Sequence, residues 1–248
     1  MWKIVAIGGW EIKNYETLTF DKRVVKLTNK TNPKALFIPT ASQEAAWYIK
    51  TFRNVYWHHL GCNTDILYLL KQKPDFEEIK EKILWSDLIY VWWGNTLKMM
   101  KKWRSLGVDK LLEQAYQNWT VLSGLSAGSI CWFEAGQSDS MSFNSEDDNR
   151  KYIKVRWLGL LKWIHCPHFS KQERIKDFEG FIQKHKDIWI AISDYCAIEF
   201  IDNKFRVLSD NEENKAYKVF YNKKQKQVIR KEIPKYKDLV DVSYLYEN

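Results

Sequence analysis

The chain has 248 residues, of which 45% are apolar and 28% charged. This composition is typical of a globular protein and excludes a disordered one, and the length suits one large α/β domain better than two. No apolar run approaches the roughly 20 residues that span a bilayer, so we expect no membrane partner. Residues 1–9 are expected to form a strand and a glycine turn rather than a secretory signal, which predicts a cytoplasmic protein.

The formal net charge is +8, but the lysines are spread along the chain and are densest in Lys223-Lys224-Gln225-Lys226. Because no nucleic-acid-binding motif accompanies them, we expect no nucleic-acid partner. A solvated basic surface is the first interpretation, and attraction of an acidic substrate is the second. The four cysteines form no C-x-x-C pair, which favours buried thiols over zinc ligands or disulfides.

Along the chain, short apolar runs alternate with longer stretches of helical spacing. Expected strands are 3–7, 34–39, 64–69, 88–92, 120–123, 188–192, 196–201 and 204–208; expected helices are 43–60, 75–84, 96–118, 126–135 and 170–186. Apolar strands separated by helices are typical of a mostly parallel sheet covered on both faces, a three-layer α/β sandwich.

The end of the chain has a different pattern. Residues 196–222 are expected to form successive antiparallel strands, and 223–248 an extended, charged C-terminal extension. No internal repeat or low-complexity linker interrupts the chain. We therefore predict a single domain over 1–248.

Half of the ten glycines lie within a few residues after expected strands: Gly8, Gly9, Gly94, Gly124 and Gly128. In open parallel sheets, ligands bind in the crevice at the carboxyl ends of the strands. Glycines concentrated there indicate close approach of the backbone to a substrate, although tight strand-to-helix turns alone would also use them.

Ser126 stands between Gly124 and Gly128, after the apolar run Thr120-Val121-Leu122. A serine between two glycines at a strand-to-helix junction is held exposed on a sharp turn, and the backbone N–H groups of the following helix point towards it. The pattern predicts that Ser126 is a nucleophile.

A serine nucleophile needs a base, and histidine is the usual one. His165 and His168 flank Cys166-Pro167 after the apolar run 158–164, and the proline restricts the chain to a loop there. A histidine on such a loop is well placed to be the base. The remaining histidines, expected at the surface or in packing contacts, are His58, His59 and His185.

The acid that would orient the histidine has three candidates. Asp194 directly follows an expected strand, Asp139 lies in a loop close in sequence to the serine, and Glu134 is a third option. For each of them, an ordinary loop or capping carboxylate is the alternative interpretation.

Three motifs occur in order: Trp92-Trp93-Gly94-Asn95-Thr96, Gly124-Leu125-Ser126-Ala127-Gly128 and Cys166-Pro167-His168-Phe169. With them, residues 1 to about 210 resemble peptidase family S51, which comprises peptidase E (the aspartyl dipeptidase) and the cyanophycinases. The resemblance implies a flavodoxin-like fold related to class I glutamine amidotransferases. It also implies serine-type hydrolysis of small peptides next to aspartate, without metal or cofactor.

The resemblance implies roles for particular residues. Ser126 matches the family nucleophile and His168 the base, and Asp194 is favoured as the acid over Asp139. Backbone groups of Gly94 and Ala127 match the oxyanion donors. Asn95 matches a residue on the substrate side, and Lys171 and Arg174 lie near the position of an arginine that binds the substrate's aspartate carboxylate.

One departure from the family pattern is that Trp92 and Trp93 replace glycines, which narrows the approach to the oxyanion site. Trp93 and Trp132 flank the expected site and could line a specificity pocket. Two other functions remain open: a catalytically silent relative that binds a small acidic or amide ligand, and an amidase or esterase on the same residues. We expect a monomer or a homodimer.

Overall fold

The computed structural model describes residues 1–138, 153–185 and 187–247. Its central sheet has the strand order β14-β11-β10-β1-β5-β4-β2-β3. The five strands from β1 to β3 pair in parallel, whereas β10, β11 and β14 add an antiparallel edge. These strands are β1 (Lys3–Ile7), β2 (Lys34–Ile38), β3 (Asn63–Ile66), β4 (Leu88–Val91), β5 (Val121–Leu125), β10 (Cys196–Ile201), β11 (Lys204–Ser209) and β14 (Val240–Asp241).

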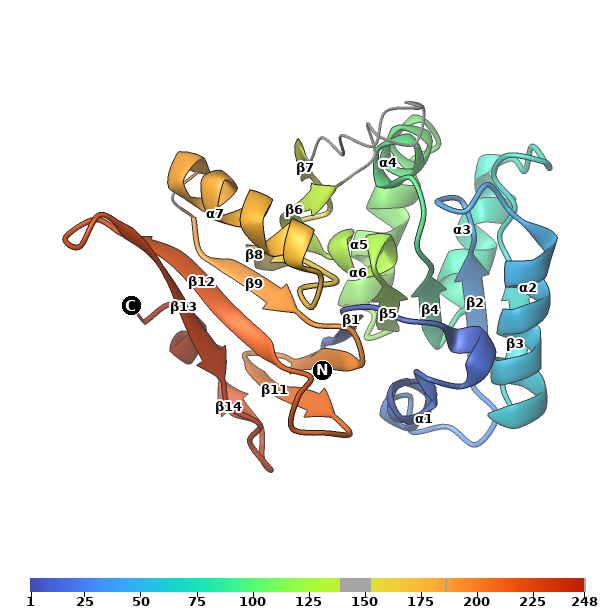
Figure 1. Ribbon diagram of the computed structural model, residues 1–248. Coiled ribbons are helices and arrows are strands. Elements are labelled where there is room, and N and C mark those ends of the chain that lie inside the picture. Colours follow the sequence, from blue (N-terminus) through green and yellow to red (C-terminus); the bar gives the residue numbers. More distant parts are fainter. Residues whose placement is uncertain (139–152, 186, 248) are drawn as a thin grey trace.

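Both faces of the central sheet are covered (Figure 1). Side chains alternate along each strand, so Val5 and Ile7 face one cluster while Ile4 and Ala6 face the other. The first cluster is closed by α1 (Leu18–Leu27), α2 (Ala46–Phe52) and the π-helical segment η2 (Arg53–His59). The second is closed by α3 (Phe76–Trp85), α4 (Thr96–Ser105) and α5 (Val108–Gln117).

Local sequence explains where several helices begin. The Asp75 side chain accepts the Glu78 N–H at the start of α3, and the Asn95 side chain accepts the Lys98 N–H at the start of α4. The single helix expected over 96–118 is divided, because Gly107 adopts a φ of 72° between α4 and α5.

A second sheet has the strand order β13-β12-β9-β8-β6-β7. Figure 1 shows it beside the first, with α7 (Gln172–His185) lying over it and the β12–β13 hairpin at the far side. One face packs with the central sheet in a shared core, and the other packs under α7. Its strands are β6 (Phe133–Ser138), β7 (Ile153–Arg156), β8 (Leu161–Cys166), β9 (Trp189–Ile192), β12 (Ala216–Asn222) and β13 (Gln227–Ile233).

The α/β fold class is confirmed, but three expectations about elements are wrong. The helix expected over 126–135 ends early, because α6 (Ala127–Ile130) is followed directly by strand β6. Helix α1 and strands β7 and β8 are additional elements. The segment 223–248, expected as an extended tail, instead forms β13, β14 and a short 3-10 helix that buries Leu245.

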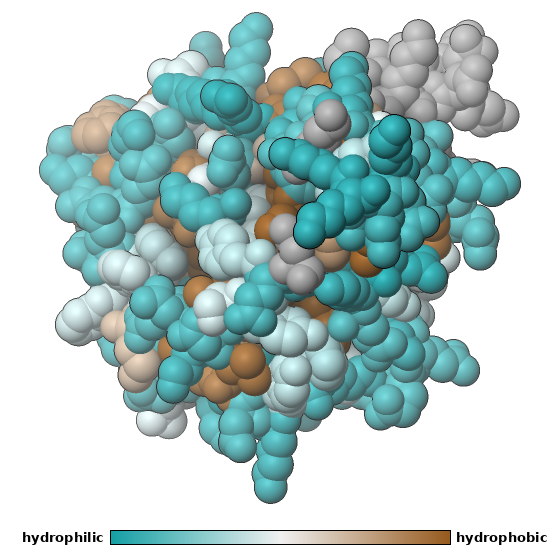
Figure 2. Space-filling model, turned by 90° about the vertical axis from the view of Figure 1, so that its left-hand side faces the viewer, coloured by the Kyte–Doolittle hydropathy of each residue, from teal (hydrophilic) through white to brown (hydrophobic). Residues whose placement is uncertain are grey.

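The outer face over α7 and the β12–β13 hairpin is mostly hydrophilic, with small apolar areas between charged side chains (Figure 2). All four cysteines are buried free thiols, as expected. None of the helices in the described part of the chain has the length and apolar character needed to cross a membrane.

Candidate active site

Ser126 lies between β5 and α6 with φ 57° and ψ −113°, a conformation that is rare for a residue with a side chain. The flanking glycines make this turn possible. A Cβ on Gly128 would lie 2.0 Å from the Val91 carbonyl oxygen, and one on Gly124 would lie 2.3 Å from the Gly128 oxygen. Only glycine fits at either position, which explains the Gly-x-Ser-x-Gly spacing.

Three side chains form a continuous hydrogen-bonded chain. The Ser126 hydroxyl lies 2.8 Å from His168 Nε2, and His168 Nδ1 lies 2.5 Å from Asp194 Oδ1. The Ser170 hydroxyl donates to the other Asp194 oxygen. Because an ionised carboxylate can only accept, Nδ1 carries the proton and Nε2 accepts from the serine. This is the tautomer that a general base requires.

The ends of three strands bring these side chains together. His168 follows β8, and its N–H donates to the Gly8 oxygen after β1 over 3.1 Å. Asp194 follows β9, the neighbouring strand of the second sheet. Gly9 contacts both side chains: a Cβ there would lie 1.9 Å from Asp194 Oδ1 and 2.3 Å from His168 Nδ1.

The electrostatic environment favours a neutral imidazole beside a charged carboxylate. Burial lowers the pKa of His168 below its ordinary value, and Arg174 and Lys171 act in the same direction against the raising effect of Asp194. Burial alone would raise the pKa of Asp194, but hydrogen bonds from His168 and Ser170 hold it below its ordinary value. Both groups are therefore in the protonation states of a base and its orienting acid at neutral pH.

Two residues that line the cavity with Ser126, Ala127 and Gly94, have backbone N–H groups without an acceptor among the described residues. Ala127 is the first residue of α6, where N–H groups have no intrahelical acceptor. Gly94 has a φ of 147° and lies so close to the backbone of Ala41 that a Cβ on Gly94 would be 2.0 Å from the Ala41 carbonyl oxygen. Neither N–H donates to another group within the described residues, so both are available to a ligand oxygen.

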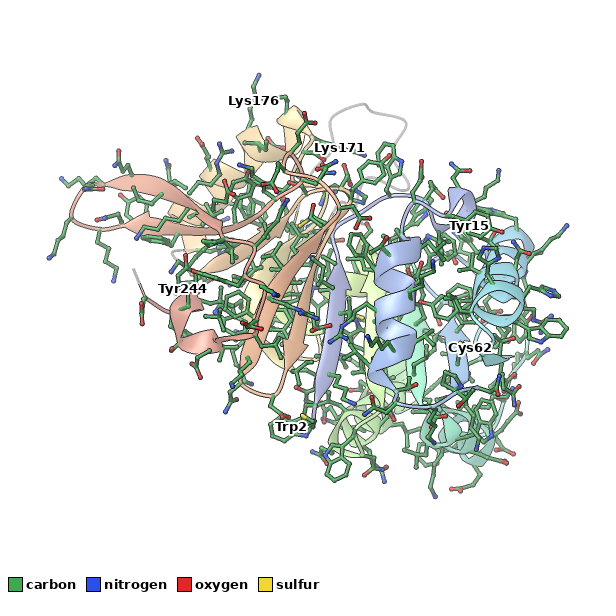
Figure 3. All side chains as sticks on the ribbon, turned by 90° about the horizontal axis from the view of Figure 1, so that it is seen from below. Trp2, Tyr15, Cys62, Lys171, Lys176 and Tyr244 are labelled. Atoms are coloured by element: carbon green, nitrogen blue, oxygen red, sulfur yellow. The ribbon has the colours of Figure 1, made fainter. Side chains whose placement is uncertain are left out.

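A cavity of about 570 Å³ opens beside Ser126. Its walls combine aromatic, acidic and basic side chains: Glu11 contributes a carboxylate, while Lys171 and Arg174 contribute cations. Figure 3 shows Lys171 at the end of the molecule towards which β1 runs, opposite Trp2. The lining residues are Trp10, Glu11, Trp93, Gly94, Thr96, Leu125, Ser126, Ala127, Ile130, Gln137, Pro167, His168, Lys171 and Arg174.

Several other candidates lie elsewhere. Asn95 is buried, caps α4 and does not line this cavity, so its expected place on the substrate side is not observed. Trp132 is fully buried in the core, and of the two tryptophans expected to flank the site only Trp93 reaches the cavity. Glu134 points to solvent from β6, and Asp139 lies outside the described residues.

The other histidine of this segment, His165, lies on β8 rather than on a loop and is a core residue. Its Nδ1 lies 2.8 Å from the Ile190 carbonyl oxygen and its Nε2 lies 2.9 Å from the Ser129 hydroxyl. Burial lowers its pKa to about 3. His165 therefore stays neutral, and the histidine that is hydrogen-bonded to Ser126 is His168.

Several residues reach the site only through the fold and could not be predicted from the sequence. Ser170, Glu11 and Gln137 carry no recognisable motif. Gly9 was expected in a turn, but nothing in the sequence indicates that its α-carbon touches the His168–Asp194 pair. For Ser170, its place two residues after His168 is the one signal the sequence offers.

A serine, a histidine and an aspartate in hydrogen-bonded order at the carboxyl ends of strands are the arrangement of a hydrolase. Residues 4–208 match the sequence model of peptidase family S51. The chain belongs to this family, as the motifs around Gly94, Ser126 and His168 predicted.

Relatives and solved structures agree with this membership. The uncharacterized peptidase YgaJ of Bacillus subtilis is 31% identical over 223 residues, which cover 88% of this chain and 92% of YgaJ. The peptidase PM1590 of Pasteurella multocida is 26% identical over 187 residues, 74% of this chain and 84% of that protein.

Two crystal structures share the fold. A peptidase from an acI-B1 Actinobacterium has a TM-score of 0.73 at 17% identity, with 97% of both chains covered. A putative peptidase E protein from Listeria monocytogenes EGD-e has a TM-score of 0.63 at 19% identity, with 85% of this chain and all of that chain covered.

Proposed function

We propose that this protein is a serine peptidase that hydrolyses small peptides, preferentially Asp-X dipeptides, through an acyl-enzyme on Ser126. The observation that carries the proposal is the hydrogen-bonded series from Ser126 through His168 to Asp194. Membership of a peptidase family supports hydrolysis of peptide bonds.

In the first half of the reaction, His168 Nε2 removes the hydroxyl proton as Ser126 Oγ attacks the scissile carbonyl carbon. The N–H groups of Gly94 and Ala127 hold the negative oxygen of the tetrahedral intermediate. Asp194 orients the imidazole and stabilises the imidazolium. His168 then gives its proton to the leaving amine, and the C–N bond breaks.

In the second half, water attacks the ester carbonyl of the acyl-enzyme. His168 takes a proton from that water, and the Ser126 oxygen leaves and recovers its proton from the imidazolium. No step needs a metal or a cofactor. Asp194 fills the acid's place in this scheme.

The cavity supports a small substrate. Its volume of about 570 Å³ suits a short peptide, and Trp93 narrows the approach where family members carry glycine. Lys171 and Arg174 on its wall favour a substrate with an acidic group, which agrees with the resemblance to peptidase E.

The test is a panel of Asp-X dipeptides, other dipeptides and simple esters, assayed with the native protein and with Ser126→Ala. We expect cleavage of Asp-X dipeptides by the native protein and loss of several orders of magnitude in the variant. Preference for esters would identify the esterase alternative, and full activity of Ser126→Ala on a cleaved dipeptide would overturn the proposal.

A further inference from the structure

Gln137 is a polar side chain on the cavity wall that the proposed mechanism does not use. It lies on β6 and is fully buried. Its Oε1 accepts a hydrogen bond from the Cys166 thiol over 3.1 Å. Its Nε2 has no hydrogen-bond partner among the described residues, although the residue lines the same cavity as Ser126.

A buried amide donor without an acceptor destabilises a fold, and an apolar side chain of the same size would avoid that cost. A glutamine at a cavity wall escapes the cost when a ligand supplies the acceptor. The orientation of the amide agrees with this, because the thiol occupies Oε1 and leaves Nε2 as the group that still needs a partner.

The charged side chains near Gln137 indicate which kind of ligand group would accept the hydrogen bond from its Nε2. Arg174, which is 5% exposed, lines the same cavity as Gln137. Arg174 also lies beside the Cys166 thiol: burial raises the pKa of that thiol to about 12, and Arg174 acts in the opposite direction. The Gln137 amide and the Arg174 guanidinium therefore both lie beside the Cys166 thiol. Lys171 lines the same cavity.

We propose that Gln137 is a specificity-determining residue whose amide N–H binds, together with Arg174, the carboxylate of the substrate's acidic side chain. This inference rests on the proposed function, since it names a group that recognises the peptidase's substrate. A carboxylate fits better than a carboxamide because the neighbouring side chains are cationic and a carboxylate accepts hydrogen bonds on both oxygens.

Binding to Ser126→Ala tests this without turnover. The probes are aspartyl-leucine and asparaginyl-leucine, which differ in a single group, measured by calorimetry. We expect Ser126→Ala to bind aspartyl-leucine more tightly than asparaginyl-leucine. Adding Gln137→Met, which keeps the length but removes the donor, should weaken aspartyl-leucine binding about tenfold and asparaginyl-leucine binding less.

Gln137→Glu gives the sharper result, because a second carboxylate repels the aspartyl side chain but accepts from the asparaginyl amide. The ratio of the two affinities should fall by about 100-fold or reverse. If the buried glutamate prevents folding, as judged by thermal unfolding, Gln137→Met decides the question. Gln183→Met, the same exchange on the exposed face of α7, is the matched control and should change neither affinity.

An unchanged affinity ratio in either Gln137 variant would overturn the proposal, as would an equal loss for both dipeptides, which would mark a structural role. A failure of the proposed function can be distinguished from a failure of this inference. If the proposed function is wrong, Ser126 of the native protein will not react with a fluorophosphonate. The binding comparison does not depend on that reaction.

Discussion

Ser126 and His168 both have a positive φ, of 57° and 55°, which residues with a side chain rarely adopt. Each such residue costs on the order of 1–3 kcal/mol of stability. The conformations persist because the neighbouring backbone fixes them: the Ser126 N–H donates to the Ile7 oxygen, and the His168 N–H donates to the Gly8 oxygen. The backbone strain therefore falls on the two residues whose side chains would carry the chemistry.

Ser126→Gly should therefore stabilise the protein while abolishing activity. Glycine adopts a positive φ without strain, so the free energy of unfolding should rise by about 1 kcal/mol. Ser126→Ala is the control, because it loses the same hydroxyl and keeps the strain. Denaturant unfolding measures both, and a glycine variant no more stable than the alanine variant would contradict the argument.

The pH dependence of kcat/KM should reflect the lowered pKa of His168. The base acts only when neutral, so activity is lost as the pH falls through the folded pKa, which burial holds below the ordinary 6.5. We expect the acidic limb of kcat/KM for a dipeptide to have its midpoint below pH 6.5. A midpoint at or above pH 6.5 would show that the imidazole is not held neutral as described.

Gly9→Ala should displace the His168–Asp194 pair, because the new methyl group would overlap both side chains. A displacement of this kind can cost about 100-fold in rate. Gly180→Ala on α7 is the matched control, since nothing lies within 4 Å of a Cβ there. Steady-state rates of both variants measure the effect, and equal rates would show that Gly9 does not position the pair.

At the scale of elements, a buried carboxyl joins α1 to η2. Asp21 accepts hydrogen bonds of 2.8 Å from the hydroxyls of Thr17 and Tyr56. Burial raises its pKa from 3.8 to about 7, so the folded state retains a proton that the unfolded chain releases. The associated stability is complete below pH 3.8 and is lost as the pH rises towards 7.

Asp21→Asn should remove this pH dependence. A pKa shift of about three units corresponds to at most about 4 kcal/mol of free energy of unfolding. The native protein should therefore lose stability between pH 4 and 7, and the variant should lose much less over the same range. The free energy of unfolding at several pH values measures the difference. Parallel curves for the two proteins would contradict the assignment.

Helices and strands with a clear period of apolar residues were predictable from the sequence, whereas those that depend on tertiary contacts were not. The strand Lys3–Ile7 alternates between two buried faces, and 75–84 has a capping aspartate, so both were found close to their observed bounds. Strand β7 is only partly buried and pairs at a sheet edge, so its sequence has no strong pattern. Residues 130–133 are all apolar, and such a short run suits a helix and a buried strand equally.

The same distinction applies to the site. Ser126 and His168 were predictable because a turn between glycines and a loop after proline have local signatures. The preference for Asp194 over Asp139 came from the family resemblance and from its place directly after an expected strand, and in the structure Asp194 is hydrogen-bonded to His168. Gln137 lies on β6, where the sequence predicted a loop after a helix ending at residue 135, so its approach to the cavity could not be foreseen.

At the scale of the whole molecule, the C-terminal segment completes both sheets. Strand β13 pairs with β12 along seven residues, and β14 pairs with β11. Ile233 and Leu245 lie in the core that the two sheets share. The segment after residue 222 is therefore part of the folded structure rather than an appendage.

Truncation after Asn222 should accordingly be destabilising, because it exposes the edge of β12 and removes buried apolar side chains. We expect the shortened chain to aggregate or to unfold at a markedly lower temperature than the full chain. Thermal unfolding and solubility measure this. A soluble truncated protein with the native unfolding temperature would show that the segment contributes nothing to the fold.

The claim that Ser126 is an activated nucleophile is tested most directly by treating the native protein with a fluorophosphonate. Mass spectrometry of its peptides then identifies the modified residue. We expect one modified residue, Ser126, with labelling abolished in Ser126→Ala and strongly slowed in His168→Ala. An unlabelled native protein, or a label on another serine such as Ser129 or Ser170, would contradict it.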